Sequence, residues 1–388
     1  MLIFYGVVIS WFAVFVCIGC SLGIAVSCIL RVVQKKNVFD IFVVTMLAVP
    51  LGLLFGRILY CLFSNDILTT FSEYINLTNG GFGLFGVMLG VFIAVVLACR
   101  FFDCGEIGEM LDCIVPGCTL AITIGRFATR FTSSEIGYPV NFKLFTVYDV
   151  KENVHNLAIF DLDGIFEAII FAICLFTFFY TRNIKGSSGI TSMVMLALHG
   201  TNQVVMDSMR ADPLMLGINN FIKISQIIGI LCCISVLVYF MVVTAKNDGF
   251  SKFHMISIPI ILVSIVLGVL GEYRVGSTNY ISKHLLMLFG MLMLDWLTLD
   301  FAFKTIASKE ETAMESEDED DEPFALPERP ERATRVQRIP SDRSERSYDS
   351  YDRRPAQSSG FNRHQRNTSD NRNIDYESLK HELDKLNI

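Results

Sequence analysis

Four arginines, Arg57, Arg126, Arg130 and Arg210, lie near the ends of long apolar segments. A guanidinium group can hold a phosphate by paired hydrogen bonds, and such a contact is strong where water is scarce. Taken as a set, these arginines indicate a site for an anionic phosphate at the headgroup depth of a membrane. Any one of them could equally well reach the interface or close an internal ion pair.

Polar residues near these arginines suggest partners for them. Asp207 and Glu135 carry carboxylates that could pair with some of the guanidinium groups. His199 lies in an apolar segment, where a single histidine is more often a packing residue than a catalytic one. Polar side chains inside a membrane also suit a solute path, so a transporter remains an alternative. The residues that carry this alternative are His199, Asn202, Gln203 and Asp295.

The apolar residues occur in long blocks and make up 52% of the 388-residue chain. A helix needs roughly 20 apolar residues to cross a bilayer. The pattern therefore predicts an all-α, polytopic transmembrane bundle of about nine spans. The expected spans are 7–30, 39–63, 82–102, 110–131, 165–180, 190–209, 222–245, 255–270 and 285–303.

Positively charged residues are concentrated in alternate loops, after the first, third, fifth and seventh expected spans. Loops rich in lysine and arginine stay in the cytoplasm, which predicts an outside N-terminus and a cytoplasmic C-terminal tail. In this orientation Arg57, Arg126, Arg130 and Arg210 gather at the outer face. That placement opposes the usual charge bias and so favours a functional role.

Composition divides the chain into three parts: a main membrane domain at 1–245, two additional transmembrane helices at 246–307 and a charged tail at 308–388. The tail holds an acidic run at 315–322 and then a mixture of Arg, Ser, Asp and Pro, which predicts disorder. Leucines at 379, 383 and 386 have helical spacing and predict a short terminal helix.

Several other classes of chemistry lack support in the sequence. The cysteines lie mostly in apolar runs, where they act as small hydrophobic residues, and imply no disulfide framework. Cys113 and Cys118 have no second pair or nearby histidine that would complete a metal site. The sequence has no nucleotide-binding motif and no basic nucleic-acid surface. We therefore expect no metal, cofactor or nucleic-acid partner.

Several segments resemble motifs of the prolipoprotein diacylglyceryl transferase family, in order, over roughly the first 240 residues. Gly56–Phe63 resembles its GRxxYxxF segment, and Gly80–Gly90 its glycine-rich third-span entry. Gly125–Gly137 is similar to the signature GRxGNFxNxExxG, with the phenylalanine and the glutamate each displaced by one residue. Phe166–Ala168 resembles the LYEA element. Asp207 and Arg210, which are three residues apart, resemble the family's ExxR element.

The resemblance implies a bacterial cytoplasmic membrane enzyme that moves the diacylglyceryl group of phosphatidylglycerol onto the lipobox cysteine of a prolipoprotein. Arg126 would then hold the phosphate and stabilise the leaving group, with Glu135 beside it. His199 is a weaker catalytic candidate, because the thiol needs a base. The implied substrate-binding residues are Arg57, Tyr60, Arg130, Gln203, Asp207 and Arg210.

The chain departs from the family pattern at positions that carry chemistry. Phe85 stands at the family's histidine, Thr129 and Thr132 at its asparagines, and Gln203 at an arginine. His199 or Arg130 could replace the missing groups. An inactive family member that binds phospholipid or lipoprotein precursors as a scaffold therefore remains an alternative to an active transferase.

Overall fold

The computed structural model describes residues 2–4, 7–63, 81–132, 134–150, 153–211, 214–215, 223–247, 249–273 and 280–320. The chain divides into two compact units, Met1–Ala325 and Leu326–Ile388. The second unit lies outside the described residues, as do the predicted disorder beyond residue 320 and the predicted terminal helix. The description below concerns the first unit.

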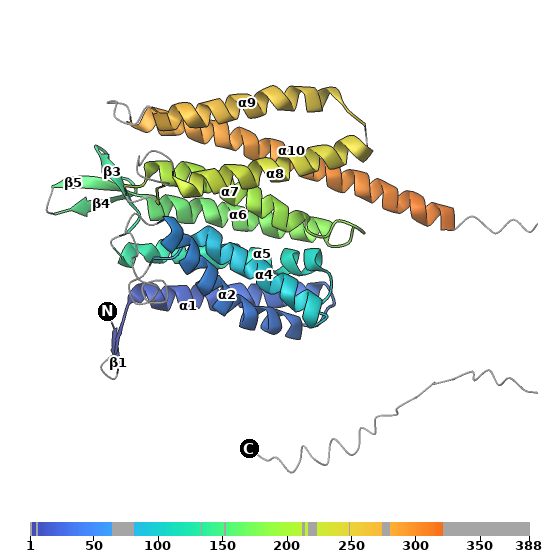
Figure 1. The fold of residues 1–388 in the computed structure, drawn as a ribbon, viewed down its shortest axis with the longest axis horizontal. Helices are drawn as coiled ribbons and strands as arrows, with labels where there is room; N and C mark the ends of the chain where they lie inside the picture. Colours follow the sequence, from blue (N-terminus) through green and yellow to red (C-terminus); the bar gives the residue numbers. More distant parts are fainter. Residues whose placement is uncertain are drawn as a thin grey trace, which may run out of the picture. The chain divides into compact units, whose positions relative to one another are not determined.

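Nine α-helices of at least 18 residues dominate the described part of this unit. Successive helices run in opposite directions (Figure 1). The last residues of α2, α5 and α7 therefore lie at one end of the bundle, which we call the site end. The helices are α1 Trp11–Val33, α2 Phe39–Phe63, α4 Leu84–Phe101, α5 Ile107–Ala128, α6 Ile159–Thr181, α7 Ile190–Met209, α8 Ile224–Asn247, α9 Lys252–Tyr273 and α10 Tyr280–Asp320.

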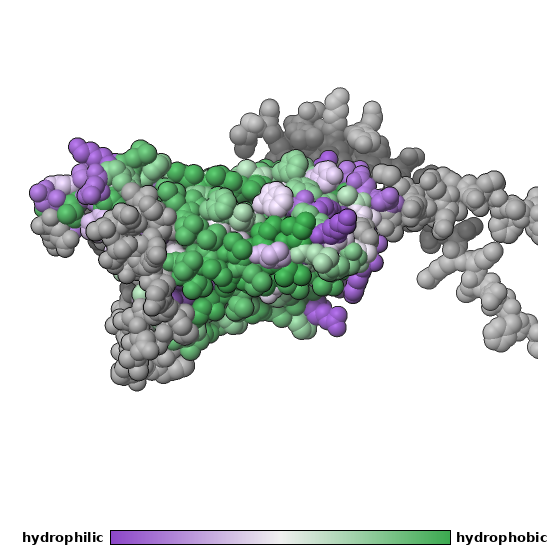
Figure 2. Space-filling view, turned by 90° about the horizontal axis from the view of Figure 1, so that it is seen from above, coloured by the Kyte–Doolittle hydropathy of each residue, from purple (hydrophilic) through white to green (hydrophobic). Residues whose placement is uncertain are grey.

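The predicted membrane fold is confirmed. Eight of these helices are long and apolar enough to span a bilayer. The face of the molecule seen in Figure 2 is broadly apolar, with hydrophilic residues toward the two ends of the bundle. The ninth, α7, is more polar, but 17 of its 20 residues are buried against neighbouring helices. Lipid therefore does not contact most of its polar groups, which would be costly in hydrocarbon.

The predicted spans at 39–63 and 190–209 coincide with α2 and α7. The last span was predicted too short, because α10 continues to Asp320. The expected boundary between the membrane part and the tail at residue 308 thus lies inside a helix. The residues after Phe303 are mostly Lys, Glu, Ala and Met, which favour helix, and the next proline is Pro323.

Short strands were missed by the all-α prediction. A three-stranded antiparallel sheet links α5 to α6 at the site end, in the order β3-β5-β4 (Figure 1). Its strands are β3 Ile136–Val140, β4 Thr146–Asp149 and β5 Val154–Ala158. A hairpin of β1 Leu2–Phe4 and β2 Val7–Ile9 precedes α1. Strands of three to five residues are too short to show a clear apolar alternation.

Glycines allow close packing between several helices. A Cβ atom at Gly117 of α5 would lie 2.2 Å from the carbonyl oxygen of Gly23 in α1. A Cβ at Gly200 of α7 would lie 2.4 Å from the carbonyl oxygen of Gly229 in α8. Small residues of this kind bring helix backbones together in membranes, where lipid provides no hydrophobic drive between helices. The two contacts fix α5 and α7, the helices that carry the candidate site.

Asp112 positions the start of α7. This buried side chain in α5 accepts hydrogen bonds from the backbone N–H groups of Gly189 (2.7 Å) and Ser192 (2.9 Å). The first N–H groups of a helix have no partner within the helix, so a carboxylate from a neighbouring element can accept their hydrogen bonds. Its negative charge also interacts favourably with the positive end of the helix dipole.

Candidate functional site

Arg126 is the centre of a polar cluster at the site end. It lies in the last turn of α5 and contacts three other elements. Its Nη1 donates to Glu135 Oε1 (2.6 Å), its Nε to Asp163 Oδ2 (2.8 Å) and its Nη2 to Gln203 Oε1 (3.1 Å). A guanidinium has five N–H donors, so two remain beyond these three contacts. The geometry leaves Arg126 able to bind a further acceptor.

Two acids on α6 extend the cluster into the bundle. Asp163 and Glu167 are four residues apart and therefore face the same side of the helix. Asn202 Nδ2 of α7 donates to Asp163 Oδ1 (2.6 Å) and to Glu167 Oε1 (3.1 Å). His199 Nδ1, also on α7, lies 2.5 Å from Glu167 Oε1, and both side chains are fully buried. These contacts join α6 and α7 by a row of polar side chains.

Arg210 joins the same cluster from the end of α7. Its Nη1 lies 3.4 Å from Glu135 Oε1 and 3.3 Å from Asp207 Oδ1. The backbone of β3 holds it there, since Gly137 forms a bridge with Arg210 and Ala211 N donates to Ile136 O. Glu135 therefore lies between two guanidinium groups that come from separate helices.

Arg57 and Tyr60 form a neighbouring group on α2. Arg57 is buried, donates from Nη1 to the carbonyl oxygen of Gly81 (3.1 Å) and lies 5.6 Å from the centre of the Tyr60 ring. Four residues after Gly81, the Phe85 ring contacts the His199 ring at 5.4 Å. The α2–α4 pair thus lies against the polar row of α7.

Arg130 does not join the Arg126 cluster, contrary to the hypothesis that it replaces the missing arginine. Its Nη2 pairs with Asp161 (2.6 Å), and its side chain is 62% exposed, against 11% for Arg126. Asp161 and Asp163 are two residues apart on α6 and so point to different faces. Thr129, which directly follows α5, donates to the carbonyl oxygen of Gly125 in that helix.

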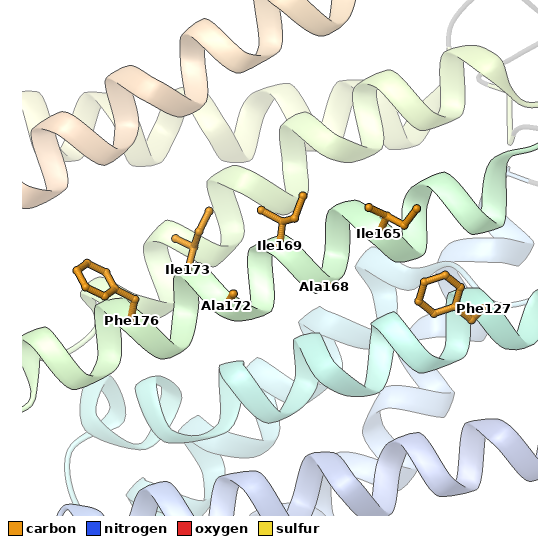
Figure 3. Close-up of a pocket in the computed structure, with 7 residues that line it drawn as sticks. All are labelled: Phe127, Ile165, Ala168, Ile169, Ala172, Ile173 and Phe176. Carbon is orange, nitrogen blue, oxygen red and sulfur yellow. The ribbon is translucent and has the colours of Figure 1, made fainter. Parts of the chain in front are cut away.

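An apolar groove of about 550 Å³ runs along the face of α6 that carries Ile165 and Ile169, away from the face of Asp163 and Glu167. Figure 3 shows its lining residues, with Phe127 from α5 at one end and Phe176 at the other. A second hollow near the sheet shares Phe127 and Ile165 with it and includes Arg130 and Lys143. The cationic side chains of Arg130 and Lys143 therefore lie near the Phe127 end of the apolar groove. Phe127 directly follows Arg126 in the sequence.

The sequence analysis missed Asp161 and Asp163 as site residues, and used Glu167 only as part of a motif. The sequence did carry a sign of their role, because the acids at 161, 163 and 167 lie at the start of an otherwise apolar segment. Burying an ionisable group in a membrane costs free energy, so such residues are usually functional. Which arginine each acid meets depends on the packing of α5 against α6. Among the described residues, no group of His, Cys, Asp and Glu could hold a metal ion.

Glu135, which follows the end of α5, has a shifted pKa. Its burial opposes ionisation, but the positive charges of Arg126 and Arg210 outweigh this and lower the pKa below the ordinary value of 4.5. A lowered pKa in the folded state means that the carboxylate stabilises the fold above pH 4.5 and loses this effect as the pH falls through the lower, folded value.

Thermal unfolding of Glu135→Gln in detergent tests this effect. We expect the variant to be less stable than the wild type near pH 7, because the ion pairs with Arg126 and Arg210 are lost. The difference should shrink as the pH falls below 4.5 and through the lower, folded value, because the wild-type carboxylate then also becomes neutral. A difference that stays constant down to the most acidic condition would contradict the assignment.

Fold and site together define an integral membrane protein with an arginine–carboxylate cluster at one end of a helical bundle. The chain belongs to the prolipoprotein diacylglyceryl transferase family, whose family model matches residues 1–243. This confirms the resemblance found in the sequence.

Several relatives carry the name phosphatidylglycerol–prolipoprotein diacylglyceryl transferase. The protein from Finegoldia magna is 26% identical over 228 residues, 58% of this chain and 88% of the relative. The protein from Clostridioides difficile is 25% identical over 238 residues, 61% of this chain and 92% of the relative. The protein from Synechocystis sp. is 30% identical over 161 residues, 39% of this chain and 56% of the relative. The family is a family of membrane transferases.

Proposed function

We propose that this protein transfers the diacylglyceryl group of phosphatidylglycerol to the cysteine thiol of a prolipoprotein lipobox. The observation that carries the proposal is the Arg126 cluster, in which α5, α6, α7 and the loop before β3 meet around one guanidinium. In the reaction a C–S bond forms and the C–O bond to the phosphate breaks. The electron pair of that bond leaves with glycerol phosphate.

Arg126 is the group that we assign to the phosphate. Asp163 and Gln203 hold its guanidinium from two sides, so its remaining N–H groups have a fixed direction. Positive charge held in place before the reaction stabilises the negative charge that builds on the leaving phosphate. Arg210 shares Glu135 with Arg126 and adds a second positive charge nearby.

The His199–Glu167 pair is the candidate base for the acceptor thiol. With Nδ1 engaged by Glu167, a neutral imidazole keeps its lone pair on Nε2, where it can accept a proton. His199 also touches Phe85, which stands at the family's histidine position. The imidazole is thus close to the position expected in the family, although it comes from another helix.

The apolar groove on α6 suits an acyl chain of the lipid. Its lining is made of Phe, Ile and Ala side chains, and Arg130 and Lys143 lie where a headgroup would reach the interface. The charge bias of the loops supports an outer location of the site end in a bacterial cytoplasmic membrane, with an outside N-terminus and a cytoplasmic tail.

A transfer assay tests the function. The purified full chain in phosphatidylglycerol vesicles, given a lipobox peptide, should yield a thioether-linked diacylglyceryl peptide detected by mass spectrometry. A peptide with serine in place of the cysteine should give no product, and His199→Phe should lower the rate strongly, because general-base catalysis contributes about 100-fold or more. Lipid binding without product would contradict transfer and favour the scaffold alternative.

A further inference from the structure

The helices α9 and α10 lie beyond residues 1–243, to which the family model extends. They are nevertheless part of the bundle, because α10 packs against both α7 and α8. Its buried residues recur at helical spacing and share one apolar core with residues of α7. The buried side chains on this face of α10 are Met287, Met291, Leu294, Leu297 and Phe301.

One carboxyl group interrupts the apolar face of α10. Asp295 Oδ1 accepts a hydrogen bond from Thr201 Oγ1 of α7 at 2.6 Å. Thr201 lies between His199 and Asn202, which bond to α6. Residues two apart on a helix point to different faces. Thus α7 is held by polar contacts on two faces, by α6 on one and by α10 on the other.

A second polar contact joins α9 and α10 to the end of α7. The carbonyl oxygen of Ser208 accepts from Lys223 Nζ at 3.3 Å and lies 3.4 Å from His284 Nε2 of α10. Lys223 pairs with Glu272 of α9 at 2.9 Å. Ser208 directly follows Asp207, a contact of Arg210. The two additional helices therefore contact α7 at both its middle and its site end.

We propose that the α9–α10 pair positions α7 for the reaction, and that Asp295 is a positioning residue that acts through Thr201; this rests on the proposed function. Apolar side chains pack well in several helix rotations, whereas one buried polar pair specifies a single register. The Asp295–Thr201 bond fixes the rotation of α7. That rotation in turn fixes Asn202 and Gln203, and through them the direction of Arg126.

Transfer kinetics of four variants test the proposal. Asp295→Leu and Thr201→Val each remove the bond, and we expect kcat to fall about tenfold with KM for phosphatidylglycerol unchanged, because catalytic geometry is lost and lipid binding is kept. The double variant should be no worse than either single variant. Asp295→Asn keeps an oxygen acceptor and should retain most of the activity.

Asp300→Leu is the matched control, since Asp300 lies on the same helix but pairs with Lys304 and is partly exposed. It should leave transfer unchanged. Normal activity of Asp295→Leu, additive effects in the double variant, or an Asp295→Asn variant as poor as Asp295→Leu would each overturn the proposal.

Hydrogen–deuterium exchange separates this proposal from the proposed function. Amides of α7 near Thr201 should exchange faster in Asp295→Leu and Thr201→Val, but not in Asp295→Asn or Asp300→Leu. If the wild type makes no product while exchange follows this pattern, transfer fails as a function but α10 still positions α7. Unchanged exchange in Asp295→Leu overturns the positioning role whatever the activity.

Discussion

Replacing Arg126 by alanine is expected to lower diacylglyceryl transfer by about 100-fold or more, the usual cost of removing a group that stabilises transition-state charge. Beyond its three contacts, the Arg126 guanidinium keeps donors for a phosphate. Its loss also leaves Glu135 and Asp163 without their nearest positive charge in a buried site. The measurement is the rate of thioether product formed from phosphatidylglycerol and a lipobox peptide.

Two further variants make this result specific. Arg126→Lys keeps the charge but has three donors on one nitrogen in place of five in a planar fork, so it cannot keep the present contacts and also bind a phosphate. We expect a large loss of rate with a smaller loss of stability. Arg100→Ala removes an exposed arginine in the last turn of α4, at the opposite end of the bundle, and should leave the rate unchanged. Wild-type rates in folded Arg126→Ala protein would exclude Arg126 from the reaction.

Replacing Gly200 by alanine should cost about 1–3 kcal/mol of stability, the usual range for overpacking. The new Cβ would lie 2.4 Å from the carbonyl oxygen of Gly229, so the backbones of α7 and α8 must separate. This cost must exceed the gain of about 1 kcal/mol that alanine brings to a helix. A lower midpoint of thermal unfolding in detergent is the expected result.

Gly125→Ala provides the control, because it is the same chemical change in a neighbouring helix. Apart from the adjacent backbone of its own helix, a Cβ at Gly125 would have no atom of the described residues within 4 Å, so the gain in helix propensity is not offset. We expect its unfolding midpoint to equal or exceed that of the wild type. If both glycine variants shift the midpoint in the same direction, the close contact of α7 with α8 does not limit stability.

The residues that suggested a solute path have structural partners. His199 and Asn202 bond to acids of α6, Gln203 bonds to Asp163 and Arg126, and Asp295 accepts from Thr201. These contacts explain why polar side chains occur in an apolar bundle, since each satisfies another buried group. Because these polar side chains bond to other side chains of the bundle, the contacts favour the transferase interpretation over the transporter interpretation.

The sequence determined the membrane spans, because crossing a bilayer sets a length and an apolar composition that any packing must respect. It also determined that Arg57, Arg126 and Arg210 lie at the same end of the bundle, because each is near the end of an even-numbered predicted span. Positions along a helix follow from counting residues. Contacts between helices do not.

The three-dimensional structure, in its helix ends and its helix packing, decided which charges meet. Arg126 and Arg130 are four residues apart and would share a helix face, yet one is in the cluster and the other is exposed. The reason is local: α5 ends at Ala128 and a 3₁₀ turn over Thr129–Phe131 changes the direction of the next side chains. Likewise, the partner of Asp295 lies 94 residues earlier in the chain, where only helix packing can bring it.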